Sequence, residues 1–340
     1  MSLKLPIPFL PIAHLLLQRS GDRLPRSPRF TGHTAKSFVY PPPDFYHVGA
    51  MNPFQRSLAT VTRREFLHAS ALLAGATLLP GLHAAAAPAK GAVRIGACVV
   101  GLEQAKQAGL DGVEVGVGDA ADRLSIADPE VRKRYRAQMK ETGLPICSLM
   151  MGLLNSNPLA SDPRGPAWLE QSIDAAKDLG ARVILVAFFG KGDLLGSDGK
   201  VKPGDVDVVV QRLKAAAPRA KDAGVILGIE NYLEAKDNAR ILERINHDSV
   251  RLYYDVFNTG ATKGYDVPAE LRLLKDRLAQ VHFKNGPNFL ENGQVKFEPI
   301  AAALKEINFK GWIVLETSSP SKDAVADVKR NAEFARGLFK

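Results

Sequence analysis

Short apolar runs alternate with longer amphipathic stretches from residue 93 to the end of the chain. Eight of the runs are rich in β-branched or aromatic residues and are bounded by polar or Gly-containing turns, as expected of strands. These runs cover residues 93–99, 112–117, 146–149, 182–188, 225–229, 250–254, 278–281 and 312–315. The amphipathic stretches, which are typical of helices, cover residues 104–108, 129–142, 167–179, 206–223, 237–245, 268–275, 299–307 and about 321–339. Regular alternation of eight strands and eight helices predicts parallel strands joined by crossover helices, an α/β fold consisting of a single (β/α)8 TIM barrel.

Proline and glycine mark several helix ends in this pattern. Asp128-Pro129 and Val267-Pro268 place proline in a first helical turn, where its missing N–H costs nothing. A glycine that could adopt φ > 0 follows four of the helical stretches, at Gly109, Gly143, Gly180 and Gly224. The repetition of one helix-Gly-strand unit favours a barrel over a two-layer α+β fold.

The region before the barrel resembles an export signal. Residues 62–67, Thr-Arg-Arg-Glu-Phe-Leu, precede an apolar segment at 69–82 and an alanine run at 84–87. Paired arginines, an apolar core and a small-residue cleavage site are the successive parts of a twin-arginine signal peptide. The apolar core is too short for a membrane span, which needs about 20 residues. The alternative is an ordinary amphipathic or buried helix.

Residues 1–50 are Pro-rich, basic and without periodicity, so we interpret them as disordered or as a misassigned start. Translation from Met51 would place the paired arginines at the usual distance from the amino terminus. We therefore expect residues 51–87 to be the signal peptide and 88–340 the barrel. The predicted partner of the leader is the twin-arginine export machinery, and the predicted location is periplasmic or otherwise exported. An uncleaved leader acting as an anchor is the alternative.

Removal of the leader changes how the charge is interpreted. The chain has a net charge of +9, but residues 1–87 carry nine Lys/Arg and three Asp/Glu, which leaves 36 Lys/Arg and 33 Asp/Glu beyond them. The remaining 253 residues thus have a net charge of +3. We therefore expect no nucleic-acid partner and no stable membrane span in the mature protein. Its two cysteines, Cys98 and Cys147, lie in strand-like runs and are expected to be buried thiols, or a disulfide if they are adjacent.

Four residues of metal-binding type follow or end the last four strand-like runs: Glu230, Asp255, His282 and Glu316. They are 25, 27 and 34 residues apart, about the length of one β/α unit. The carboxyl ends of barrel strands face the mouth, so these side chains should converge. Three carboxylates at one point would repel one another strongly, and a divalent cation would hold them together.

The ligand types restrict the metal without identifying it. Oxygen-rich coordination with one imidazole suits Mn²⁺, which we favour, and also Co²⁺, Mg²⁺ or Zn²⁺. Each acidic residue alone could instead be a helix cap or a surface group. His282 makes the set distinctive, because the only other histidine in the mature chain, His247, lies in a polar loop.

Lys284 and Glu114 are further candidates for the site. Lys284 could offset the negative charge and hydrogen-bond a substrate oxygen, or it could be a surface lysine. Glu114, at the end of the second strand-like run, could contact substrate across the mouth, or it could be a salt-bridged barrel carboxylate. Aromatic residues that could form an apolar wall for a sugar, but are equally typical of a core, are Trp168, Phe188, Phe189, Phe257 and Phe289.

The motifs Gly-Ile-Glu-Asn, Tyr-Asp-Val-Phe-Asn, Val-His-Phe-Lys-Asn and Val-Leu-Glu-Thr resemble those of the sugar isomerase/epimerase superfamily with the xylose-isomerase-like barrel, which includes ketose 3-epimerases. The resemblance covers nearly all of the mature chain. It implies that Glu230, Asp255, His282 and Glu316 bind one divalent metal and that Glu230 and Glu316 act as acid and base. Several ketose epimerases have a histidine three residues beyond the aspartate, where this chain has Asn258, a candidate substrate contact.

The same residues suit proton abstraction beside a carbonyl. A metal that binds two neighbouring oxygens of a hydroxy-ketone stabilises the enediolate that forms when a proton leaves the carbon beside the carbonyl. One glutamate removes this proton and the other returns one. No phosphate-binding glycine motif is present, and the segment after the last strand, 317–321, is Ser-rich, so we expect an unphosphorylated ketose or sugar derivative. The alternatives are a lyase or hydratase acting on 3-keto-glycosides and a non-catalytic carbohydrate-binding barrel.

Overall fold

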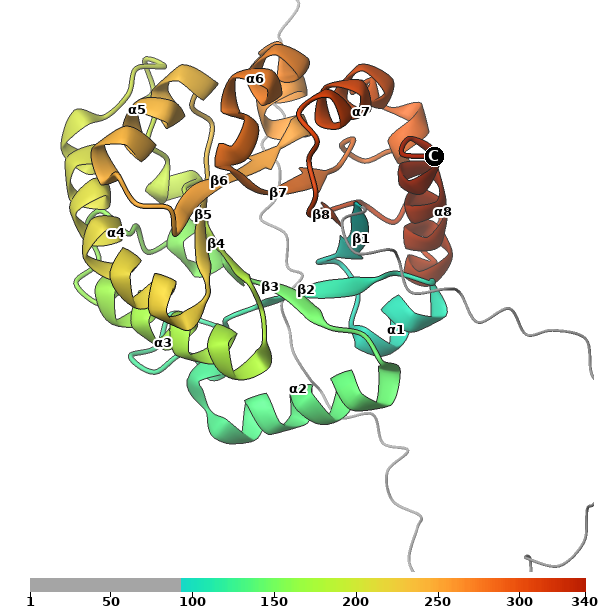
Figure 1. Ribbon diagram of the computed structural model, residues 1–340, viewed down its shortest axis with the longest axis horizontal. Coiled ribbons are helices and arrows are strands. Elements are labelled where there is room, and N and C mark those ends of the chain that lie inside the picture. The colour runs from blue at the N-terminus through green and yellow to red at the C-terminus, as the bar shows by residue number, and fades with distance from the viewer. Residues whose placement is uncertain (1–92) are drawn as a thin grey trace, which may run out of the picture. The chain divides into compact units, whose positions relative to one another are not determined.

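Eight parallel strands close into one barrel in the computed structural model, which describes residues 93–340 (Figure 1). Each strand pairs with the next along the chain, and β1 closes the barrel by pairing with β8. The strands are β1 (Arg94–Ala97), β2 (Gly112–Gly116), β3 (Ile146–Met151), β4 (Val183–Ala187), β5 (Ile226–Glu230), β6 (Val250–Asp255), β7 (Leu278–Phe283) and β8 (Trp312–Leu315). The predicted TIM barrel is confirmed.

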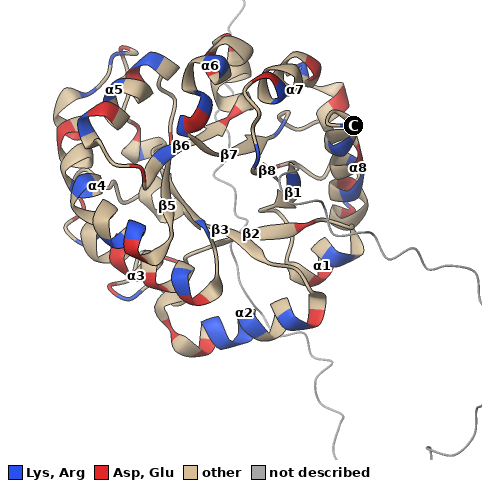
Figure 2. Cartoon of the chain, viewed as in Figure 1, with Lys and Arg blue, Asp and Glu red and all other residues tan. Residues whose placement is uncertain are grey.

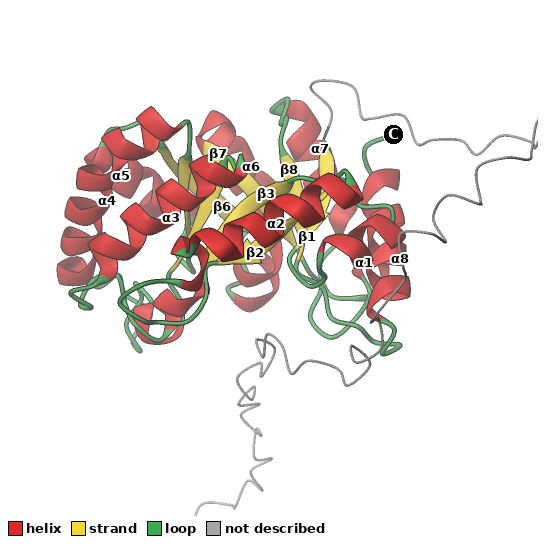
Figure 3. Cartoon of the chain, turned by 90° about the horizontal axis from the view of Figure 1, so that it is seen from below, coloured by secondary structure: helices red, strands yellow, loops and turns green. Residues whose placement is uncertain are grey.

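One α-helix follows each strand, and the eight form a ring outside the barrel (Figures 1 and 3). They are α1 (Leu102–Gln107), α2 (Pro129–Thr142), α3 (Gly165–Leu179), α4 (Pro203–Ala223), α5 (Ala235–Ile245), α6 (Val267–Leu274), α7 (Phe297–Glu306) and α8 (Ala324–Gly337). Short 3₁₀-helices lie in the loops: η2 (Ser125–Ala127), η3 (Gly152–Asn155), η4 (Gly190–Gly192), η6 (Lys275–Arg277) and η7 (Leu290–Asn292). A π-helix, η5 (Phe257–Thr262), directly follows β6.

Element types agree with the sequence prediction, whereas several ends differ by a few residues. Helix α2 has the predicted bounds, and Asp128 caps it by accepting a hydrogen bond from the N–H of Glu130. Helix α4 begins at Pro203 rather than at residue 206, because proline suits a first helical turn. The four helix-terminating glycines all have positive φ, for example 75° at Gly143 and 69° at Gly224.

Strand residues alternate between the helix layer and the barrel interior. The interior cluster includes Leu185, Tyr253, Trp312 and Val314, while their neighbours pack against the helices. A side chain at Gly112 would meet the Trp312 ring at 2.7 Å, so glycine there leaves room for the ring. The same alternation directs polar residues of the strands into the barrel.

Charged residues of both signs are interspersed on the outer helices (Figure 2). Within residues 93–340, no helix combines the length and the apolar character that crossing a membrane requires. The predicted leader and signal peptide, including the Met51 start, lie outside the described residues, so both stay predictions.

Candidate metal and active site

The four predicted ligands meet at the carboxyl ends of neighbouring strands. Glu230 and Asp255 are the last residues of β5 and β6, His282 is the last but one of β7, and Glu316 follows β8. Asp255 and His282 are register partners. One donor atom from each of the four residues lies within 4.8 Å of the others. The structure thus brings the predicted set together.

His282 lies at the centre of this group. Its Nδ1 is 3.0 Å from Oε1 of Glu230, 3.5 Å from Oε2 of Glu316 and 3.9 Å from Oδ2 of Asp255. Lys284 completes the group: its Nζ lies 3.0 Å from Asp255 Oδ2 and donates a hydrogen bond of 2.7 Å to Glu316 Oε2. We call these five residues the mouth cluster. Lys284 therefore partly neutralises the carboxylates, as predicted for its charge.

The residues of the mouth cluster differ in their access to solvent. The side chain of Glu316 is 35% exposed, whereas that of Glu230 is 5% and that of Asp255 is 0% exposed. Glu316 therefore forms the open edge of the cluster. A molecule that enters the mouth meets Glu316 before it meets the deeper carboxylates.

Burial and charge shift the protonation equilibria of the cluster in opposite directions. Burial raises the pKa of Glu230 to about 7, although His282 opposes this shift. Burial alone would also raise the pKa of Glu316, but Lys284 and His282 outweigh it and lower that pKa to about 2. Burial would lower the pKa values of His282 and Lys284, yet the surrounding carboxylates hold both well above their usual range. The two glutamates thus have very different proton affinities.

The donor set fits a divalent cation. Asp255 Oδ1 accepts hydrogen bonds from the backbone N–H groups of Phe257 and Asn258, whereas its buried Oδ2 has no hydrogen-bond partner among the described residues. Lys284 approaches Oδ2 as an ion pair only. Ligands at about 2.1 Å from one small cation lie roughly 3–4 Å apart, and the three carboxylate oxygens lie 3.0, 3.5 and 3.9 Å from His282 Nδ1. Three carboxylates and one imidazole suit Mn²⁺, Co²⁺, Mg²⁺ or Zn²⁺.

Glu114 lies on the opposite side of His282, inside the barrel. Its Oε1 is 3.2 Å from His282 Nε2, and its Oε2 accepts hydrogen bonds from Ser148 and Tyr253. The Glu114 side chain is 0% exposed. The structure therefore favours the alternative given above, a paired barrel carboxylate, over the predicted substrate contact.

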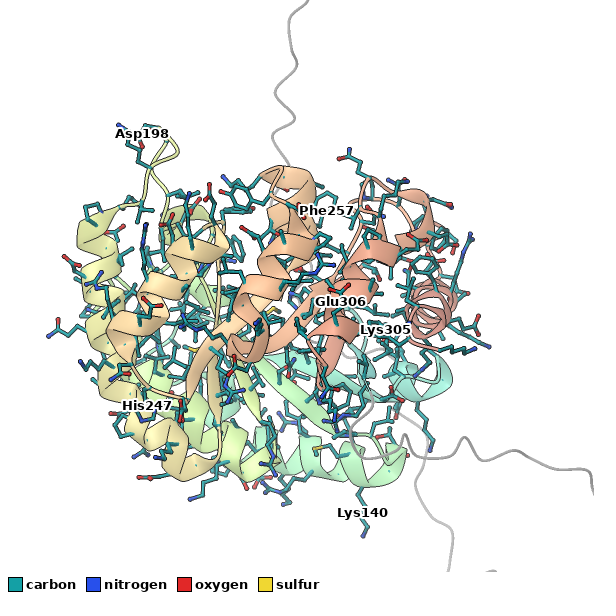
Figure 4. All side chains as sticks on the ribbon, turned by 45° about the horizontal axis from the view of Figure 1, so that its top comes forward. Lys140, Asp198, His247, Phe257, Lys305 and Glu306 are labelled. Carbon is teal, nitrogen blue, oxygen red and sulfur yellow. The ribbon has the colours of Figure 1, made fainter. Side chains whose placement is uncertain are left out.

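Asn258, the third predicted substrate contact, lies in π-helix η5. It is buried and donates its backbone N–H to Asp255, which fixes the carboxylate. His247 precedes β6 and therefore lies at the opposite end of that strand from Asp255. Figure 4 labels His247 before the strand and Phe257 after it, so the two mark its two ends. His247 is thus remote from the cluster, and the substrate role of Asn258 stays a prediction.

The aromatic candidates separate into core residues and residues near the mouth. Trp168 and Phe188 are fully buried. Phe189, which follows β4, packs edge-on against Tyr232, with ring centroids 4.8 Å apart. Tyr232 was not predicted as part of the apolar wall, although its position two residues beyond the end of β5 was the available signal.

The two cysteines are free thiols in the structure. Burial raises the pKa of Cys98 well above its usual range and that of Cys147 to about 12. The Sγ atom of Cys98 lies within 4.8 Å of ligand atoms of Glu114 and His282. Because both thiols are held neutral and Glu114 is already paired, this second group is a poor metal site.

Comparison with known proteins identifies the family. The model of the xylose isomerase-like TIM barrel family matches residues 102–338. A putative L-ribulose-5-phosphate 3-epimerase of Escherichia coli K12, SgbU, is 28% identical over 249 residues, which are 66% of this chain and 85% of the relative. These names support the prediction of an enzyme of the isomerase or epimerase class.

Two solved structures have the same fold at lower identity. The D-allulose 3-epimerase from a Methylomonas species, in complex with D-allulose, aligns with a TM-score of 0.60 at 18% identity and covers 73% of this chain and 97% of its own. The E. coli 3-keto-D-glucoside 4-epimerase YcjR aligns with a TM-score of 0.61 at 18% identity, covering 72% and 100%. The chain belongs to the xylose isomerase-like TIM barrel family.

Proposed function

We propose that this protein is a divalent-metal-dependent epimerase or isomerase of an unphosphorylated ketose or related sugar derivative. One observation supports the proposal above all: four ligand-type side chains from consecutive strands meet within 4.8 Å, and the buried Asp255 Oδ2 among them has no hydrogen-bond partner in residues 93–340. A buried carboxylate oxygen without a hydrogen bond is costly even beside an ion-pair partner such as Lys284, and a bound cation would remove that cost.

In this proposal Glu230, Asp255, His282 and Glu316 hold the cation. A divalent ion in that position would polarise the substrate carbonyl and neutralise negative charge that develops on its oxygens. The protein contributes a fixed geometry, since Asp255 is held by two backbone N–H groups and His282 is packed between strands. Lys284, which contacts Glu316, is the proposed hydrogen-bond donor to a substrate oxygen.

Glu230 and Glu316 are the proposed proton-transfer groups. One carboxylate removes the proton from the carbon beside the carbonyl, and the other delivers a proton to the opposite face of the same carbon, which inverts its configuration. Delivery of the proton to the former carbonyl carbon would instead move the carbonyl group along the sugar chain, which is isomerisation. The different exposure of the two side chains, 35% for Glu316 and 5% for Glu230, is consistent with different roles.

A feature of the β8–α8 loop supports an unphosphorylated substrate. Barrel enzymes often bind phosphate between the last strands and a following helix N-terminus. Here Asp327, in the first turn of α8, is buried and accepts hydrogen bonds from Ser319 Oγ (2.7 Å), Ser321 N (2.9 Å) and Ser321 Oγ (2.6 Å). The donors that would bind a phosphate already bind a carboxylate, whose charge would also repel one.

We also propose an exported location for the mature chain, on the basis of the leader sequence alone. Phosphorylated sugars are scarce outside the cytoplasm, which agrees with the arrangement around Asp327. Amino-terminal sequencing of the protein from a periplasmic extract should begin near residue 88. Recovery of the chain with residues 51–87 intact in the cytoplasm would contradict export.

The first experiment is elemental analysis of the purified chain, beside His282→Ala, Glu230→Ala and the control His247→Ala. We expect about one divalent ion per chain in the wild type and in the control, and none in the other two variants. A wild type that takes up no Mn²⁺, Co²⁺, Mg²⁺ or Zn²⁺ would contradict the metal-dependent proposal.

The second experiment is turnover in D₂O of L-ribulose and D-allulose, with L-ribulose-5-phosphate as the phosphorylated comparison. Solvent deuterium in an epimer or isomer of a free ketose supports the proposal, and preference for the phosphorylated sugar contradicts its substrate class. Release of an aglycone from a 3-keto-glycoside would indicate a lyase. No turnover by the metal-loaded chain would favour a carbohydrate-binding protein.

A further inference from the structure

A chain of buried polar side chains lies behind His282, on the side away from the mouth. Glu114, Ser148, Tyr253 and Gln280, which we call the interior network, come from β2, β3, β6 and β7. All four are buried. The mouth cluster uses none of them as a ligand, so their conjunction requires a separate explanation.

Strand register brings the members of the interior network together in pairs. Glu114 is the register partner of Ser148, and Tyr253 that of Gln280. A register shift falls directly before Glu114 and another directly before Tyr253. Such irregularities often redirect side chains beside functional sites, and here each one precedes a residue that points to the same place.

The amide orientation of Gln280 sets the direction of the hydrogen bonds in the network, and it leaves Gln280 Oε1 without a hydrogen-bond partner among residues 93–340. The Nε2 group of Gln280 donates both of its protons, to Ser148 Oγ at 3.0 Å and to Tyr253 OH at 3.1 Å. Each hydroxyl accepts one of these protons and donates its own to Glu114 Oε2, at 2.7 Å for Ser148 and 2.9 Å for Tyr253. The opposite orientation of the Gln280 amide would accept those protons and leave Glu114 without them.

The second oxygen of Glu114, Oε1, faces His282. Oε1 lies 3.2 Å from His282 Nε2, a distance at which an Nε2–H group would donate a hydrogen bond to the carboxylate. The other ring nitrogen, Nδ1, is the one that faces Glu230, Glu316 and Asp255. An imidazole can bind a metal only through a nitrogen that carries no proton.

We propose that Glu114, supported by Ser148, Tyr253 and Gln280, is a positioning residue that fixes His282 with its proton on Nε2, so that Nδ1 is the metal ligand. This inference rests on the proposed metal site. It assigns Glu114 a role different from the substrate contact expected from sequence, and it explains why four strands direct polar groups into an otherwise apolar interior. Carboxylates behind metal-binding histidines orient the ring and increase its basicity.

Replacement of Glu114 by glutamine tests the inference with almost no change in shape. In Glu114→Gln the single amide oxygen satisfies the two hydroxyl donors, which leaves the NH₂ group facing His282 Nε2 and favours the wrong tautomer, with the proton on Nδ1. Dissociation constants for Zn²⁺ and Mn²⁺, measured on the full chain by calorimetry, should rise by about 10–100-fold.

Glu270→Gln is the matched control, because Glu270 also accepts a hydrogen bond from a tyrosine, Tyr254, and one from a backbone N–H, that of Ala235. It belongs to α6 and not to the mouth cluster. We expect its metal dissociation constants to stay within about twofold of the wild type.

NMR spectroscopy of the ¹⁵N-histidine-labelled, Zn²⁺-loaded chain is the second measurement. The Nε2 proton of His282 should resonate far downfield and exchange slowly with water, and its signal is assigned by its absence in His282→Ala. Glu114→Gln should shift it upfield.

The outcomes separate this inference from the proposed function. A wild type that binds no metal contradicts the proposed function itself. A wild type that binds Zn²⁺, together with a Glu114→Gln variant of equal affinity and an unchanged Nε2 proton, overturns only the inference. If Glu114→Gln does not fold, Tyr253→Phe decides, because it removes one donor to Glu114 and keeps the ring: a several-fold weaker affinity supports the inference, and an unchanged one overturns it.

Discussion

The two sides of the His282 ring differ in how completely their carboxylates are paired. On the Nε2 side, Glu114 is 0% exposed and both of its oxygens have hydrogen-bonding partners. On the Nδ1 side, Asp255 is equally buried, but its Oδ2 has no hydrogen-bond partner within residues 93–340. Two carboxylates of equal burial thus differ in what is left for a ligand: both oxygens of Glu114 are hydrogen-bonded, whereas Asp255 Oδ2 has, among the described residues, only ion-pair contacts such as that with Lys284.

Glu316→Gln should produce the largest effect, and on turnover rather than on folding. Loss of a proton-transfer carboxylate typically reduces the rate about 10²–10⁴-fold, whereas a side chain that is 35% exposed contributes little to stability. Deuterium incorporation from D₂O into the product measures the first quantity, and thermal unfolding the second. Glu306→Gln, on the outer helix α7 and paired with Arg272, is the control and should retain full activity. Retention of more than a tenth of wild-type turnover by Glu316→Gln would contradict its assigned role.

Glu114→Ala, besides weakening metal binding, should reduce the stability of the metal-free chain, which Glu316→Gln should not. It leaves donor groups of Ser148, Tyr253 and His282 buried without an acceptor, which we expect to lower the free energy of unfolding by about 3–5 kcal/mol. Urea denaturation of the metal-free chain measures this change. A loss below about 1 kcal/mol would show that water or a rearranged side chain replaces the carboxylate, and the contrast with Asp255 would then disappear.

The sequence predicted the mouth cluster because each of its ligands follows an apolar run, where a charged residue is conspicuous. Glu230, Asp255, His282 and Glu316 end or follow their strands, so the barrel rule for strand ends was sufficient to bring them together. The strands and helices themselves were predicted because hydrophobic periodicity is a property of the local sequence. Their exact ends were less predictable because capping and loop contacts determine them.

The interior network was not predicted, because its members lie inside strands rather than at their ends. Ser148 and Gln280 interrupt apolar runs, which was the available signal, but one polar residue in a strand does not reveal its partners on other strands. Glu114 was recognised as either a substrate contact or a paired barrel carboxylate, but its neighbours were not predicted. Its pairing with Ser148 and Tyr253 depends on two register shifts that no local pattern indicates.

Lys284→Met tests how the lysine charge on the Nδ1 side of His282 affects metal binding. The Lys284 ammonium lies 3.0 Å from Asp255 Oδ2, the oxygen that a cation also requires, so its charge should oppose metal binding. Relief of about 1.4 kcal/mol of repulsion would tighten the Mn²⁺ dissociation constant about tenfold. Calorimetric titration measures the constant, and Lys305→Met on α7 is a control for loss of a lysine. If the cluster is instead a metal-free ion-pair network held together by Lys284, the variant will unfold at lower temperature and bind no metal.

Asp327→Asn extends the comparison to a paired carboxylate outside the barrel and should have the smallest effect. Hydrogen bonds from Ser319 and Ser321 lower the pKa of Asp327 below its usual value of 3.8, against the opposing effect of burial. Because the folded-state pKa is the lower one, the carboxylate stabilises the fold above about pH 4, and this contribution is lost as the pH falls through the folded-state pKa. The variant should therefore be about 1–2 kcal/mol less stable than the wild type at pH 7, and the two should converge in stability below about pH 4.

Chemical denaturation across this pH range measures the difference, with Asp222→Asn, an exposed position on α4, as the control. A difference that persists unchanged at pH 3 would mean that the shape of the side chain, and not its charge, stabilises the β8–α8 loop.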